Sequence, residues 1–124
     1  GDVVSLLAAA EFQRYWAQAA QTYALEATEP AAAQRAAAAV DAMAGAARAG
    51  ARVSTITEGA KAVLAGEDWS RAKTYGLGHG IGLDLEEAPA IAGASEVTLP
   101  PGTALALHVV LPGGIAGRTL IVAG

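Results

Sequence analysis

The chain contains no cysteine, which excludes disulfide scaffolds and zinc sites built from thiolates. Positive charge is also scarce: eight Lys and Arg stand against twelve Asp and Glu, so the formal net charge is −4. A chain with this balance has no basic surface to hold phosphates, and we expect no nucleic-acid partner. No apolar run reaches the roughly 18 residues that a membrane-spanning helix needs. Because the N-terminal residues also lack the basic flank and apolar segment of a signal peptide, we expect a cytoplasmic protein without a membrane partner.

The 124 residues suffice for one domain with a single core, and we expect that domain to span residues 1–124. Hydrophobic residues make up 53% of the chain, but 33 of its residues are alanines, which bury little area each. The core is therefore expected to depend on close packing rather than on large side chains.

Residues 2–24 predict a β-hairpin that turns near Gln13 and Arg14. An apolar run begins at Val3, and the residues that follow include the β-formers Phe12, Tyr15, Trp16, Thr22 and Tyr23. The alanines at 8–10 and 17–20 suit a helix equally well by propensity, so a helical segment is the alternative.

Two helices are predicted next. The first has Thr28 or Glu29 as its cap and Pro30 in its first turn, and it ends at Gly50. Its buried stripe consists mostly of small side chains: Ala32, Ala36, Val40, Met43 and Ala47. The second helix begins with a capping-box spacing and stops at Gly66. The box residues are Thr55 and Glu58, and the buried residues are Ile56, Ala60, Val63 and Leu64.

Short apolar runs punctuated by glycine and proline follow from residue 73. Residues 105–111 and 119–122 are predicted strands, joined by the turn-rich segment 112–114. A hairpin, two helices and then several strands indicate an α+β fold, with the helices on one face of an antiparallel or mixed sheet.

Glycines alternate on both sides of a single histidine, His79, in the segment 75–89. The missing side chains would let another backbone, a ligand or an ion approach closely. A phosphate loop is disfavoured, because no helix follows whose N-terminus would face the phosphate. The alternative is a glycine-rich, bulged strand in which local hydrogen bonds satisfy His79.

The run Gly78-His79-Gly80-Ile81-Gly82-Leu83, with Glu87-Ala88-Pro89 after it, resembles the signature of the pita-bread metallopeptidases. This family includes aminopeptidase P, prolidase, methionine aminopeptidase and the metal-free creatinase. The resemblance extends over the whole chain, from the start of the hairpin through the helices to the segments 99–102 and 119–122. It implies the second half of the pita-bread fold, a curved sheet with two helices on one face, and a degenerate member of the family.

In that family two aspartates, one histidine and two glutamates hold two divalent ions. The histidine falls on His79, but the aspartates fall on Leu7 and Gln18, and the glutamates fall on His108 and Gly117. A second histidine, which helps to bind substrate in the peptidases, falls on Glu86. Four carboxylates are thus replaced by groups without negative charge, so the resemblance implies no metal, no other cofactor and no metallopeptidase mechanism.

We therefore expect a metal-free pseudo-peptidase that resembles Xaa-Pro aminopeptidase and prolidase. Its pocket would bind a peptide or small molecule through Leu7, Gln18, His79, Glu86 and His108. The alternative is an enzyme of the same fold with metal-independent chemistry, an isomerase, cyclase or hydrolase with His79 and His108 as catalytic residues. A third possibility is a structural subunit that completes the active site of a partner.

Three further expectations concern placement. The family's catalytic domain is about twice as long, so we expect either a fragment of a longer protein or a homodimer or second chain that covers the apolar faces left open. Leu7 is expected to be buried, which would make an aspartate there destabilising. His79 and His108 are expected to share one concavity, where one imidazole titrates below the usual pKa of about 6.5.

Overall fold

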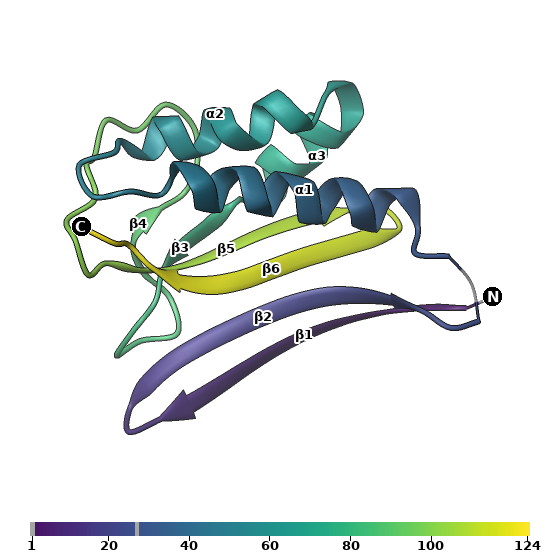
Figure 1. Cartoon of the computed structure of the whole chain (residues 1–124), viewed down its shortest axis with the longest axis horizontal. Coiled ribbons are helices and arrows are strands. Elements are labelled where there is room, and N and C mark those ends of the chain that lie inside the picture. The colour runs from purple at the N-terminus through teal and green to yellow at the C-terminus, as the bar shows by residue number, and fades with distance from the viewer. Residues whose placement is uncertain (1, 27) are drawn as a thin grey trace.

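The computed structural model describes residues 2–26 and 28–124. In chain order, the elements are β1 (Val3–Phe12), β2 (Tyr15–Ala24), α1 (Ala31–Ala46), α2 (Val53–Val63), α3 (Gly66–Tyr75), β3 (Gly78–Gly80), β4 (Glu87–Ala90), β5 (Ala104–Leu111) and β6 (Gly114–Ile121). The six strands form one sheet in the order β1-β2-β6-β5-β3-β4, and every neighbouring pair is antiparallel. This architecture, drawn in Figure 1, confirms the predicted α+β class. No helix in the described ranges is long and apolar enough to cross a membrane.

The N-terminal hairpin is present, and its turn lies where the sequence predicts it. Phe12 pairs with Tyr15, so Gln13 and Arg14 form a two-residue loop, and both have positive φ, 50° and 71°. Such turns match the twist of the strands that they join. Pairing along the whole length of β1 and β2 overrides the helical propensity of their alanines.

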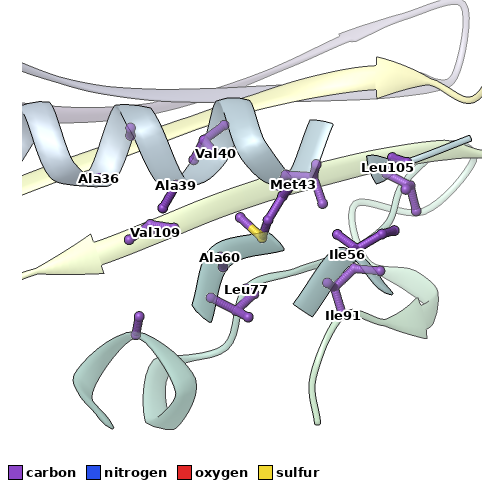
Figure 2. Packing of buried hydrophobic residues seen from close by; sticks show 14 of the residues in the cluster. Ala36, Ala39, Val40, Met43, Ile56, Ala60, Leu77, Ile91, Leu105 and Val109 are labelled. Atoms are coloured by element: carbon purple, nitrogen blue, oxygen red, sulfur yellow. The ribbon is translucent and has the colours of Figure 1, made fainter. Parts of the chain in front are cut away.

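α1 packs on β5 and β6, and α2 packs against α1. The large residues on the helix-facing side of β5 are Leu105, Leu107, Val109 and Leu111, all buried. α1 meets them with four small residues and one large one, the fully buried Met43, which points toward Ala60 and Leu77 in Figure 2. The thin stripe therefore brings α1 close to the sheet, as the composition suggested.

Several local predictions about the helices are wrong. Within the described residues the chain has three helices rather than two, because Gly66 begins α3 instead of ending a helical region. Neither Thr28 nor Glu29 caps α1; its N-cap residue is Pro30, without a side-chain hydrogen bond. Thr55 lies inside α2, whose N-cap residue is Arg52.

Three smaller corrections concern burial and strand bounds. Ala32 is only partly buried, because the stripe of α1 runs through Ala33, Ala36, Ala39, Val40 and Met43. Val63, at the end of α2, is exposed. The last strand starts at Gly114 rather than at residue 119, since β6 pairs with β5 from the turn onward.

The hairpin is attached to the rest of the sheet by a short backbone ladder and by side-chain hydrogen bonds. The β2–β6 ladder comprises only Ala20 with Gly117 and Gln21 with Ala116. Beyond it, the Thr119 hydroxyl accepts from the Gln18 N–H and donates to the Gln18 carbonyl, both at 2.9 Å. The Thr22 hydroxyl accepts from the Ile115 N–H at 2.8 Å. These bonds fix Gln18 and its strand relative to β6.

Candidate functional site

A pocket with a volume of about 440 Å³ lies between the hairpin and the histidine-bearing strands. Its lining includes all five residues expected at the site: Leu7 on β1, Gln18 on β2, His79 on β3, His108 on β5, and Glu86 in the loop before β4. Residues separated by a hundred positions in the sequence are thus neighbours in the fold.

Strand register explains why Leu7 and His108 share a face of the sheet. Leu7 pairs with Ala20, Ala20 pairs with Gly117, and Gly117 pairs with His108. Directly paired residues in a sheet project their side chains to the same face. Between Leu7 and His108 stand Ala20 and Gly117. Because their side chains are only a methyl group and a hydrogen atom, they leave space above the sheet there.

His79 occupies its place because its glycine neighbours let β3 fit between two strands. A Cβ on Gly78 would collide with the Ala106 carbonyl of β5, and a Cβ on Gly80 would collide with the Ala88 carbonyl of β4. The β3–β4 register shifts between His79 and Gly80, which marks a bulge. Of the two interpretations of the glycine-rich run, the bulged strand is therefore correct, and the close approach is by backbone.

Hydrogen bonds assign the tautomer of neutral His79. Its Nδ1 lies 2.8 Å from the Gly80 carbonyl oxygen, which only accepts, so Nδ1 carries the hydrogen. The lone pair is then on Nε2, which faces the Gln18 side-chain nitrogen at 3.5 Å. His79 thus presents a hydrogen-bond acceptor to the pocket, next to an amide.

His108 lies beside His79, and both residues are half-buried. The two ring centroids are 5.9 Å apart, and the ring of Tyr75 lies 5.8 Å from that of His108 in an edge-on arrangement. Within the described ranges, no hydrogen-bond partner reaches the buried His108 Nδ1. Burial, and secondly the neighbouring His79, lowers the pKa of His108, while the Gly76 backbone and Glu86 act in the opposite direction.

This lowered pKa predicts a pH-dependent stability. In the unfolded chain His108 has its usual pKa of about 6.5, so below that value the unfolded state binds more protons than the folded state. Stability is complete above about pH 6.5 and falls as the pH drops toward the pKa of the folded state. Urea unfolding across this range should show the fall in the parent and a smaller one in His108→Asn.

NMR titration of the imidazoles provides the direct check. His108 should titrate below 6.5, and its pKa should rise in His79→Ala, because that change removes the electrostatic influence by which His79 lowers it. A His108 titration unmoved by the loss of His79 would contradict the electrostatic contact between the two rings.

One of the expected site residues sits differently from what the sequence suggested. Leu7 has 56% of its surface exposed, so the expectation that it is buried is wrong: β1 is an edge strand, and all ten of its residues are exposed. An aspartate at position 7 would stay in contact with water. Glu86 is also exposed and lies at the pocket, close enough to His108 to influence its titration.

Tyr75 is a pocket residue that sequence reasoning missed. It is the last residue of α3, a helix that was not predicted, and its ring contacts that of His108. The available signal was its position directly before the glycine-rich run, at Gly76.

Comparisons with known proteins agree on one family and one fold. The model of metallopeptidase family M24 matches residues 1–119. Prolidase from Pyrococcus furiosus superimposes with a TM-score of 0.85 at 21% identity, covering 99% of this chain and 39% of that chain. X-Pro aminopeptidase from Thermotoga maritima gives 0.83 at 21% identity, covering 99% and 37%. Dipeptidase PepE from Mycobacterium ulcerans gives 0.78 at 26% identity, covering 99% and 36%.

These superpositions confirm the pita-bread fold. The chain spans somewhat more than a third of the length of these three structures. No curated protein matches the sequence.

Proposed function

Because the chain belongs to metallopeptidase family M24, we propose that it is a degenerate, metal-free member whose pocket binds a peptide or small molecule without cleaving peptide bonds. The observation that carries this proposal is the composition of the pocket. Leu7, Gln18 and His108 line it beside His79, at the positions where the family resemblance places carboxylate ligands. The family's chemistry depends on those carboxylates.

The residues present do not fit a centre of two divalent ions. Leu7 has no donor atom, Gln18 offers a neutral amide, and Gly117 has no side chain. Two ions bring four positive charges, and ions of the manganese or magnesium type favour charged oxygen ligands. In the parts of the chain that the structure describes, no three His, Cys, Asp or Glu side chains are grouped to hold a metal.

Packing at Gly117 also opposes a carboxylate ligand there. A Cβ at this position would lie 3.1 Å from the Leu107 carbonyl oxygen, 3.2 Å from the His108 Cβ and 3.3 Å from the Ala20 Cβ. These separations are tighter than ordinary van der Waals contact, so a glutamate would require the neighbouring strands to shift. The absence of a glutamate at position 117 therefore agrees with the close packing around Gly117.

The same pocket has the features of a small binding site. Its volume of about 440 Å³ is within the usual range for ligand pockets. It offers the lone pair of His79 Nε2, the amide of Gln18 and the carboxylate of Glu86, and Leu7 and Tyr75 supply apolar surface. Polar groups of this kind orient a ligand, while the apolar surface contributes affinity.

The second candidate is metal-independent acid–base chemistry by the histidine pair. It is favoured by the 5.9 Å separation of the two rings and by the lowered pKa of His108, which keeps that imidazole neutral at neutral pH. A neutral imidazole can accept a proton from a bound substrate. Such an enzyme would be an isomerase, cyclase or hydrolase in which His79 and His108 touch the substrate.

The test combines metal analysis with a panel of Xaa-Pro peptides. We expect no stoichiometric manganese or cobalt and no chelator-sensitive cleavage, because the pocket lacks the required carboxylates. NMR titration with the same peptides should shift the His79 and His108 imidazole signals. Stoichiometric metal with chelator-sensitive cleavage would overturn the proposal. Turnover that survives chelator and disappears in His108→Ala would instead establish the second candidate.

A further inference from the structure

The contact between Gln18 and His79 joins two strands that are not neighbours in the sheet. The Gln18 side-chain nitrogen lies 3.5 Å from His79 Nε2, although β6 and β5 stand between β2 and β3. Neighbouring strands lie about 4.8 Å apart, so the path along the sheet from β2 to β3 covers about 14 Å. The separation of 3.5 Å is already near the upper limit for a hydrogen bond. The contact therefore depends on how firmly β2 holds Gln18.

A side-chain hydroxyl holds the Gln18 backbone in place of a backbone ladder. The β2–β6 ladder includes Ala20 opposite Gly117, and the same register carried further along the strands places Gln18 opposite Thr119. There the Gln18 N–H donates to Thr119 Oγ1, and the Thr119 hydroxyl donates to the Gln18 carbonyl, both at 2.9 Å. A hydroxyl carries one hydrogen and two lone pairs, so Thr119 satisfies both backbone groups at once. Both bonds lie between inner strands, where a chain packed against the edges of the sheet would leave them unchanged.

Strand register places Thr119 and His79 in one row across the sheet. Thr119 pairs with Ala106 of β5, and Ala106 pairs with His79 of β3. Directly paired residues project to the same face, so Gln18, which lies opposite Thr119, continues the row on the pocket side. The only β5 side chain in this row is the methyl group of Ala106, which leaves room for Gln18 to reach His79. The row thus contains His79, its amide partner and the residue that binds the backbone of that partner.

We propose that Thr119 is a positioning residue of the pocket, which holds the Gln18 amide against His79 Nε2 through its two bonds to the Gln18 backbone. Thr119 itself does not line the pocket, whereas Gln18 and His79 do, so Thr119 acts on a ligand only through Gln18. Without the hydroxyl, the N–H and C=O groups of Gln18 lose their partner on β6, and β2 separates from β6 at this row to let water reach them. The effect on a bound peptide rests on the proposed function, whereas the effect on the contact between Gln18 and His79 does not.

The other end of the same ladder provides a matched control. Continued in the opposite direction, the register places Thr22 opposite Ile115, and Thr22 Oγ1 accepts from the Ile115 N–H at 2.8 Å. Thr22 also bonds to the Ser5 hydroxyl at 2.7 Å and lies outside the pocket lining. Thr22→Val therefore removes a hydroxyl bond between the same two strands without changing a pocket residue. Thr119→Ser is the conservative variant, because it keeps the hydroxyl at the tested position.

NMR of the ligand-free protein tests the positioning directly. The parent should show nuclear Overhauser effects between the Gln18 side-chain amide protons and the ring of His79. These effects should disappear in Thr119→Val and persist in Thr119→Ser and Thr22→Val, with circular dichroism verifying that each variant folds. Thr119→Ala, which also lacks the hydroxyl, takes the place of the valine variant if that variant does not fold. Retention of the effects at parental strength without the hydroxyl, or their equal loss in Thr22→Val, would overturn the proposal.

A double-mutant cycle with the peptide Ala-Pro-Ala separates positioning from a general loss of structure. Thr119→Val should weaken peptide binding about fivefold or more, and Thr119→Ser and Thr22→Val less than about twofold. In the Gln18→Ala background, Thr119→Val should cause no further loss, because the side chain that Thr119 positions is gone. An equal loss in both backgrounds would overturn the proposal. A parent that binds no peptide would instead refute the proposed function of the pocket, and the ligand-free NMR comparison would still decide the role of Thr119.

Discussion

Replacing Gly78 by alanine is expected to destabilise the domain by more than about 3 kcal/mol, a large part of the stability of a typical small protein. The added Cβ would collide with the Ala106 carbonyl and lie 3.0 Å from the Leu107 Cα, both backbone atoms of β5 that no side-chain rotation can move. Gly78 also has φ of 143°, a conformation that residues with a side chain rarely adopt. Urea unfolding followed by circular dichroism would measure the loss.

Gly93→Ala is the matched control for the backbone conformation alone. Gly93 has a positive φ of 63°, but a Cβ there would meet nothing within 4 Å. Its substitution should cost only about 1–2 kcal/mol, the usual penalty of a left-handed conformation. If Gly78→Ala proved no more costly than Gly93→Ala, β3 would not be held as tightly between its neighbours as the structure indicates. His79 would then lack the rigid support that positions it in the pocket.

The hairpin was predictable because its signals are local. Two β-rich segments flank a two-residue turn, and the turn residues take the positive φ values that such a loop needs. The helix α3 was not predictable in the same way. Ala72 is its only buried residue, so the segment has no apolar period, and Gly66 at its start is more often a sign of termination.

The start of α2 shows a second limit of local reasoning. The pair Thr55 and Glu58 has the spacing of a capping box, yet the helix begins two residues earlier, at Val53. The N–H groups of Val53 and Ser54, at the start of the helix, have no acceptor within the helix. They donate instead to the carbonyls of Val97 and Ser95, at 2.8 and 2.9 Å. A loop distant in the sequence thus performs the role of a cap, and only tertiary structure reveals it.

The pocket was predictable only through the resemblance. Composition and spacing single out His79, but they give no reason to place Leu7, Gln18 and His108 beside it. Position-by-position comparison with the family does so, and the structure brings all of them to one pocket. The comparison with the family could not predict how far each of these side chains is exposed to water. Leu7 is exposed because β1 is the edge strand of the sheet. The position of a strand in the sheet is set by the whole fold and not by the residue itself.

Restoring three carboxylates to the pocket should create a divalent metal site that the parent lacks. In Leu7→Asp/Gln18→Asp/His108→Glu, three carboxylates join His79 around the pocket of about 440 Å³, and charged oxygen atoms are the ligands that manganese favours. Without metal, the three negative charges repel one another, so the variant should be less stable than the parent. Gly117 is left unchanged, because a side chain there would press on Leu107 and Ala20.

Manganese should then stabilise the triple variant and leave the parent unaffected. Binding to the folded state alone at a hundredfold excess over Kd adds about 2.7 kcal/mol to the free energy of unfolding. Thermal melts with and without manganese would show this as a rise in Tm. The control is Leu7→Asn/Gln18→Asn/His108→Gln, which has side chains of similar shape but no charge and should show no rise. If the carboxylate variant responded no more than this control, the three positions would not converge on a common ion, and the residue-by-residue match to the family's ligands would be wrong.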